Sequence, residues 1–243
     1  MTDSLPMIDS ILYSQEKSRW KKLDDTDELV KLHRKFWIQG DYDKVLNVEG
    51  TTEVDAGAAD GDIGPECHVL DSGIPDERSK FWVRKEYIRL YKRCEDHFKP
   101  DPYMFSTPAL IVTGQPGIGK FFTCNIAVTE IYWLKGKRYW IRYVLCRRLA
   151  CKEPVMWYRG KMLYLFVEDG IYLASADHSP ISIRTRVWTL VDVDKGERVP
   201  EILAVRDTKH MIIFATPPKV KRWHRLEKTM NPALAIMNPW TRE

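Results

Sequence analysis

Hydrophobic residues recur at helical spacing in two parts of the chain. Residues 79–99 carry one such stripe, which ends before Pro100, at Val83, Tyr87, Leu90, Tyr91, Cys94 and Phe98. Residues 139–154 carry a second stripe, with arginines on the other faces, at Ile141, Val144, Leu145 and Leu149. Each stripe predicts a helix whose apolar side packs against a core.

Elsewhere the hydrophobic residues form short runs without alternation, which are typical of strands buried on both faces of a parallel sheet. Such runs occupy residues 109–113, 186–192, 210–216 and 233–237. Residues 155–175 predict further strands, separated by turns at Arg159-Gly160 and Asp169-Gly170. A basic helix is expected over 219–230. Together these segments predict an α/β fold with a largely parallel sheet flanked by helices.

The first 78 residues have a different character. Residues 1–46 predict an acidic, helical N-terminal segment, in which Asp24, Asp25 and Thr26 can cap a helix whose apolar positions are Leu29, Val30, Phe36 and Trp37. Residues 47–78 are rich in Gly, Ala and Asp and show no sustained period, which predicts a flexible linker. Residues 79–243 then form the main domain.

Charge and composition indicate the cellular compartment. The net charge of +4 conceals an asymmetry, because residues 1–75 hold 8 Lys and Arg against 16 Asp and Glu and the remainder therefore carries +12. Five cysteines without a pairing pattern indicate a reducing compartment. The chain shows neither a classical signal peptide nor an apolar run of membrane-spanning length. We expect an intracellular protein, cytoplasmic or nuclear, that is not bound to a membrane.

The strongest chemical signal follows the apolar run at 109–113. Residues 114–120 read Gly114, Gln115, Pro116, Gly117, Ile118, Gly119 and Lys120, which is the pattern G-x-x-x-x-G-K of a phosphate-binding loop. Backbone N–H groups of such a loop cradle phosphates, and the lysine reaches the β- and γ-phosphates. The pattern continues with Ser or Thr, whose hydroxyl binds Mg²⁺, but this chain has Phe121.

Later parts of the chain supply partners for this loop. In P-loop NTPases an apolar strand ending in aspartate supports Mg²⁺. Asp192 ends the run at 186–192 and is the expected metal ligand, and Asp194 is the candidate catalytic residue that orients the attacking water. Thr216, at the end of the run at 210–216, is expected near the γ-phosphate. The C-x-x-H spacing of Cys94 and His97 lacks a second pair, so packing is the better explanation than zinc.

Six segments together resemble the P-loop NTPase region of the Crinkler and retrotransposon-hot-spot-like proteins, of the fungal type. They are FWVRKEYIRLYKRC, GQPGIGK, WYRGKMLYLFVEDGIY, WTLVDVD, IIFATPP and MNPWTRE, and the resemblance covers residues 79–243. It implies an ATPase module of the AAA+/STAND kind, which in that family is often joined to a nuclease domain and in some members acts on nuclear targets. No nuclease constellation is recognisable in this chain.

The chain departs from this family at two places. The family's loop runs through Gly-Lys-Ser/Thr straight into its helix, whereas here the amphipathic helix is expected to begin 18 residues late, at Tyr139. Residues 121–138 are therefore predicted to be an insertion, and a retained intron is one origin for it. The helical lid that follows MNPWTRE in the family is expected to be missing.

These features predict binding of a nucleoside triphosphate, ATP rather than GTP, with Mg²⁺-dependent hydrolysis impaired by Phe121. One alternative is a degenerate P-loop fold that acts as a protein- or nucleic-acid-binding, effector-like molecule. Steep salt dependence of DNA binding would identify the nucleic-acid version. A truncated product that folds poorly is the remaining alternative. The sequence does not fix the nuclear target or the oligomeric state.

Overall fold

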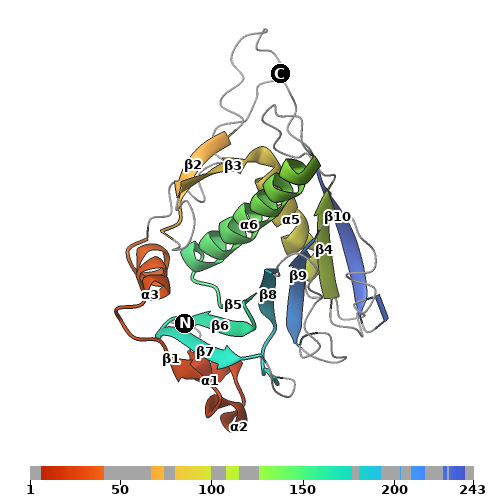
Figure 1. Ribbon diagram of the computed structural model, residues 1–243. Coiled ribbons are helices and arrows are strands. Elements are labelled where there is room, and N and C mark those ends of the chain that lie inside the picture. Colours follow the sequence, from red (N-terminus) through yellow and green to blue (C-terminus); the bar gives the residue numbers. More distant parts are fainter. Residues whose placement is uncertain are drawn as a thin grey trace, which may run out of the picture.

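The computed structural model describes residues 7–40, 67–73, 80–99, 108–114, 126–176, 181–192, 203, 209–216, 227–228 and 230–238. Its centre is an eight-stranded sheet in the order β1-β7-β6-β5-β8-β9-β4-β10 (Figure 1). The strands are β1 (Lys21–Lys22), β4 (Pro108–Gly114), β5 (Val155–Arg159), β6 (Met162–Val167), β7 (Gly170–Ser175), β8 (Val187–Asp192), β9 (His210–Ala215) and β10 (Asn231–Met237).

The sheet is mixed but mostly parallel. Strands β5, β8, β9, β4 and β10 form parallel neighbours, whereas β6, β7 and β1 extend the β5 side in antiparallel pairs. Every run that the sequence predicts as a strand coincides with one of these elements to within two residues at either end. The α/β fold with a largely parallel sheet is thereby confirmed, and both turns predicted between residues 155 and 175 are present.

Helices α5 (Lys85–Phe98) and α6 (Ile126–Ala150) cover one face of the sheet, and α6 crosses it obliquely (Figure 1). Leu110 and Val112 of β4 belong to the same hydrophobic core as Tyr91 of α5 and Val144 of α6. Because side chains alternate along a strand, the other residues of β4 face a second core. That second core contains Ile111, Phe214, Ile11, Ile183, Leu203 and Met230.

The N-terminal segment packs onto the sheet. It comprises α1 (Ile8–Ile11), α2 (Ser14–Lys17), β1, α3 (Glu28–His33) and the π-helix η1 (Arg34–Ile38). The predicted apolar positions Leu29, Val30, Phe36 and Trp37 are all buried in the same hydrophobic core as residues of α5 and α6. The predicted cap is wrong by one residue, since Asp27 accepts the N–H of Leu29 at 2.8 Å while Asp24 closes a turn with Thr26.

Two predicted boundaries change in the next region. Residues 80–84 form strand β3 (Lys80–Arg84) rather than the start of the helix, so Val83 is buried from a strand. Strand β2 (Cys67–Asp71) lies inside the predicted flexible linker and pairs antiparallel with β3. The residues of β2 pair with those of β3. The Gly-rich sequence before β2 gave no sign of this strand. Residues 47–66 and 74–78 lie outside the described residues.

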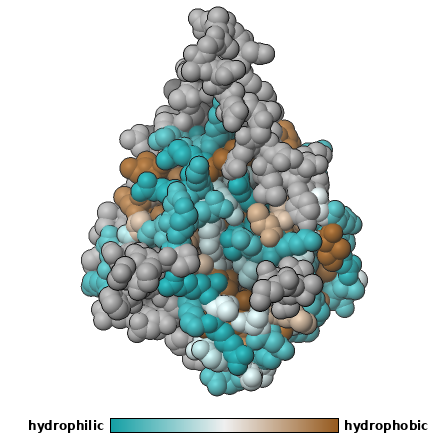
Figure 2. Space-filling model, turned by 180° about the vertical axis from the view of Figure 1, so that it is seen from behind, coloured by the Kyte–Doolittle hydropathy of each residue, from teal (hydrophilic) through white to brown (hydrophobic). Residues whose placement is uncertain are grey.

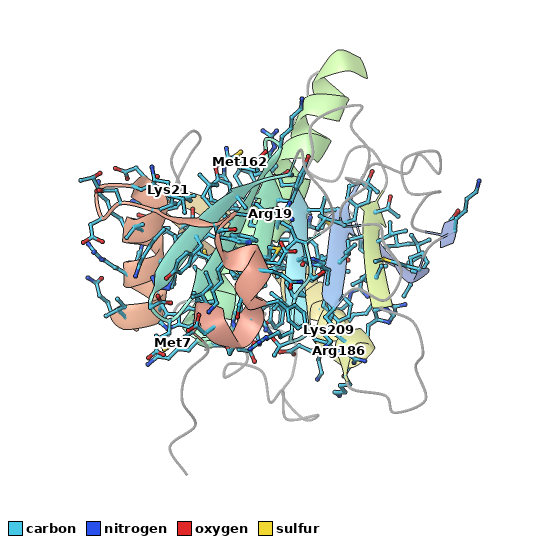
Figure 3. The ribbon with its side chains drawn as sticks, turned by 90° about the horizontal axis from the view of Figure 1, so that it is seen from below. Met7, Arg19, Lys21, Met162, Arg186 and Lys209 are labelled. Carbon is cyan, nitrogen blue, oxygen red and sulfur yellow. The ribbon has the colours of Figure 1, made fainter. Side chains whose placement is uncertain are left out.

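Helix α6 begins at Ile126, so the expectation of a helix starting at Tyr139 is wrong. The 12 residues before Arg138 add about 18 Å of helix. In Figure 3 this end of α6, in green, extends away from the sheet. The stripe predicted over 139–154 is buried at Ile141, Val144, Leu145 and Leu149, as expected. Whether residues 121–138 are an insertion stays a prediction.

The described surface on the side opposite to Figure 1 is largely hydrophilic, with separate small hydrophobic patches (Figure 2). Exposed large apolar side chains include Leu234 and Ile236 on β10. Among the described helices, none is both long enough and apolar enough to cross a membrane. The basic helix predicted over 219–230 is described only at Glu227 and Lys228, which are helical, and at Met230, which is not.

Candidate functional site

The parallel strands bring the predicted site residues to one edge of the sheet. Strand β4 ends at Gly114, β8 ends at Asp192, and Thr216 directly follows β9. All three strands run in the same direction, so these ends share the carboxyl edge. Strand β9 separates β4 from β8, which places Asp192 about 10 Å across the sheet from β4.

Strand connections diverge at this edge. The chain leaves β4 through α6 to β5 on one side, and leaves β9 for β10, which lies on the opposite side of β4. Right-handed crossovers in opposite directions lie on opposite faces of a sheet. A crevice between the carboxyl ends of such diverging strands is the usual ligand site of an open α/β sheet. The divergence between β4 and β9 therefore defines the candidate site.

Several predicted site residues cannot be placed here. Gln115, Pro116, Gly117, Ile118, Gly119 and Lys120, together with Asp194, lie outside the described residues. Gly114 is described as the last residue of β4, in register with Met237 of β10. The loop sequence thus starts at the carboxyl end of β4, a strand with a parallel neighbour on each side, as its pattern requires.

Thr216 is enclosed beside the end of β4. Its N–H donates to the carbonyl of Val112 at 2.9 Å, and only 1% of the residue is exposed. Val112 is in register with Ala215, so Thr216 lies beside Thr113 on the face opposite to α6. The buried Thr113 hydroxyl has no hydrogen-bond partner among the described residues. Two threonine hydroxyls therefore border the start of the loop, and sequence reasoning singled out only Thr216.

Asp192 lies on the other face, beneath α6. It continues the alternation of Trp188 and Leu190, whose side chains join the core under that helix. The carboxylate is buried, and its Oδ1 lies 3.8 Å from Nε of Arg138. Arg138 was not a predicted site residue, because in the sequence it is one arginine among several near residues 138–148.

A second guanidinium lies near this edge. Arg84, buried at the junction of β3 and α5, donates to the carbonyl of Asn238 at 2.9 Å. Asn238 follows β10 at the residue after Met237, which is level with Gly114. By contrast, Arg186 and Lys209 lie together at the amino ends of β8 and β9 (Figure 3), so they are remote from the loop.

The described residues do not fit a magnesium site. Mg²⁺ prefers oxygen ligands in octahedral geometry. Within the described ranges, no group of three or more His, Cys, Asp or Glu could hold a metal ion. Asp192 faces a guanidinium, and Phe121 stands where the loop pattern would supply a hydroxyl. The carboxylate expected to be a metal ligand thus has a protein cation beside it.

The competing Cys94 and His97 pair has a structural role. Cys94 is fully buried on the core side of α5, and burial raises the pKa of its thiol well above the usual range. His97 Nε2 lies 3.0 Å from the carbonyl of Ala109, and burial lowers the pKa of this imidazole. These contacts support packing rather than zinc binding, because Cys94 lies in the core while His97 contacts a backbone carbonyl.

Comparison with known proteins adds no relative. No protein-family model, no curated protein and no solved structure matches this chain.

Proposed function

We propose that this protein binds a nucleoside triphosphate, ATP rather than GTP, at the carboxyl edge of its sheet. One observation carries the proposal: β4, which leads into the sequence Gly114–Lys120, is one of the two neighbouring strands at which the connections diverge. A glycine-rich turn at such a position can bring backbone N–H groups close to phosphate oxygens.

The strand order supports the same proposal. Taken from β10, the parallel strands follow the order β10-β4-β9-β8-β5, with one strand between the loop strand and the strand ending in aspartate. The strand between them is β9, which is followed by Thr216, so the start of the loop, Thr216 and Asp192 lie at the ends of three neighbouring strands.

Each residue of the edge has a proposed task. Lys120 would place its ammonium group on the β- and γ-phosphates, and Thr216 would contribute its hydroxyl near the terminal phosphate. Asp194 remains the candidate for orienting a water molecule. Because Phe121 supplies no hydroxyl and Asp192 faces Arg138, hydrolysis is expected to be slow relative to binding.

The direct test is titration of the purified protein with ATP and with GTP in an isothermal titration calorimeter. Lys120→Ala should weaken ATP binding about 10- to 100-fold, since it removes charge-assisted hydrogen bonds. Lys92→Ala, at an exposed position of α5, removes the same charge and should leave the affinity unchanged.

Equal losses in both variants would show that only net charge matters, which contradicts the site. A stable fold that binds neither nucleotide would favour the alternative, a non-catalytic P-loop fold that binds nucleic acid or protein. DNA binding measured over a series of salt concentrations then separates these two, because phosphate contacts give a steep salt dependence.

A further inference from the structure

Resting on the proposed nucleotide site, we propose that Arg138 takes the place of the divalent cation at Asp192, so that the protein binds nucleotide without Mg²⁺. The observation is the ion pair between Arg138 and Asp192, at the edge where the phosphates would lie. The sequence predicts Mg²⁺ at Asp192, whereas the structure has an arginine side chain beside this carboxylate.

Burial makes this ion pair selective against a metal. The side chain of Asp192 is 6% exposed and that of Arg138 is 29% exposed. A buried carboxylate requires a compensating positive charge, and here a covalently attached guanidinium provides it. A divalent ion approaching Asp192 would have to displace that guanidinium and overcome its repulsion.

The position of Arg138 in α6 explains why this residue is the one beside Asp192. In a P-loop, the residue after the lysine begins the helix at the sheet edge and provides the hydroxyl for Mg²⁺. Here the helix starts at Ile126, and the part level with the end of β8 is Arg138. The helix thus presents a cation to the aspartate where a P-loop protein presents a metal-binding hydroxyl.

Neighbouring contacts hold this part of α6 in place. Tyr139 stacks on Phe81 of β3 with ring centroids 5.4 Å apart, and Trp140 is fully buried in the core. Rotation of the helix about its axis would break both contacts. Arg138 is therefore held in place relative to β8 by the packing of its two neighbours in α6.

The first arm of the test measures ATP binding in excess Mg²⁺ and in excess EDTA. The wild-type protein should bind ATP equally in both. In EDTA, Arg138→Gln should bind ATP about tenfold or more weakly, because a buried negative charge then faces the phosphates. Added Mg²⁺ should restore that affinity, since Asp192 becomes available to the ion. Arg138→Lys keeps the charge and should remain indifferent to Mg²⁺.

The second arm needs no nucleotide and measures Mn²⁺ binding by electron paramagnetic resonance. The wild-type protein should show no Mn²⁺ site at Asp192, Arg138→Gln should gain one, and the double variant Arg138→Gln with Asp192→Asn should lose it again. Circular dichroism and thermal unfolding establish that each variant is folded.

Two results would overturn the proposal: Mg²⁺ strengthening ATP binding to the wild type tenfold or more, or a wild-type Mn²⁺ site that Asp192→Asn removes. The arms also separate this inference from the proposed function. Absence of ATP binding in every condition, together with Mn²⁺ binding gained in Arg138→Gln, would overturn the nucleotide site while supporting the exclusion of metal by Arg138.

Discussion

His210 begins β9 with both ring nitrogens engaged. Nε2 lies 3.2 Å from the carbonyl of Ile181, and Nδ1 lies 3.0 Å from the hydroxyl of Thr189. A carbonyl only accepts, so Nε2 donates and Nδ1 accepts from Thr189. Complete burial lowers the pKa of His210 to about 4. The ring is therefore neutral in the folded protein.

This shift makes stability depend on pH. Between pH 6.5 and about 4 the unfolded state binds a proton at His210 that the folded state does not, so stability falls as the pH falls through this window. The expected loss from His210 is about 3 kcal/mol. Urea unfolding at a series of pH values measures it.

His210→Gln, which cannot titrate, is the control. It should be less stable at neutral pH and should show a weaker dependence over the same window. Burial also lowers the pKa of His33 and His97, so their contributions remain in both proteins. Identical pH dependence in the two proteins would contradict the assignment to His210.

The two hairpin turns require glycine to different degrees. In the β5–β6 turn, Gly160 and Lys161 both have positive φ, at 56° and 63°, which matches a type I′ turn. At the β6–β7 turn, Gly170 has φ of 138°. A side chain can enter the left-handed helical region at modest cost, but the region around 138° is essentially restricted to glycine.

The two glycines therefore predict different costs. Gly170→Ala should destabilise the protein by about 2–3 kcal/mol, and its Cβ would lie 2.9 Å from Cε of Lys22. A Cβ at position 160 would have no described atom within 4 Å, so Gly160→Ala should lower the free energy of unfolding by about 1 kcal/mol. Chemical denaturation of both variants provides the comparison, and equal costs would show that backbone conformation does not distinguish the turns.

At the scale of the whole molecule, the N-terminal segment is part of the core. Leu32 and Phe36 are almost completely buried in the same hydrophobic core as the inward faces of α5 and α6, and β1 continues the sheet beyond β7. Figure 3 shows this segment, in red, lying along that side of the sheet. The segment and the described residues of 79–243 thus pack together in one structure.

Removing residues 1–78 should therefore destabilise the remainder. Leu29, Val30, Leu32, Phe36 and Trp37 bury large apolar side chains, and their loss amounts to about 10 kcal/mol at 1.5–3 kcal/mol for each. That is comparable to the stability of an entire domain. Size-exclusion chromatography and thermal unfolding of residues 79–243 check this. A soluble monomer with an unchanged midpoint would show that these residues fold alone.

Local patterns were enough to predict most of the strands. Runs such as 187–192 and 210–215 are apolar throughout, because both faces of a central strand are buried, and that property is readable from composition alone. The turn at Gly170 and the buried stripe of α5 could also be predicted, because each depends on residues close together in the sequence. Strand β2 was missed because its apolar residues depend on pairing with β3, which a Gly-rich neighbourhood does not reveal.

The sequence by itself determined the α/β class, the phosphate-loop pattern at Gly114–Lys120 and the aspartate that ends β8, since each depends on residues close together in the chain. Only the tertiary structure decided the strand order, the N-terminal contribution to the core and the pairing of Arg138 with Asp192. Those two residues are far apart in sequence. Helix packing over the sheet edge brings them together, and no local pattern records which turn of a helix lies above which strand.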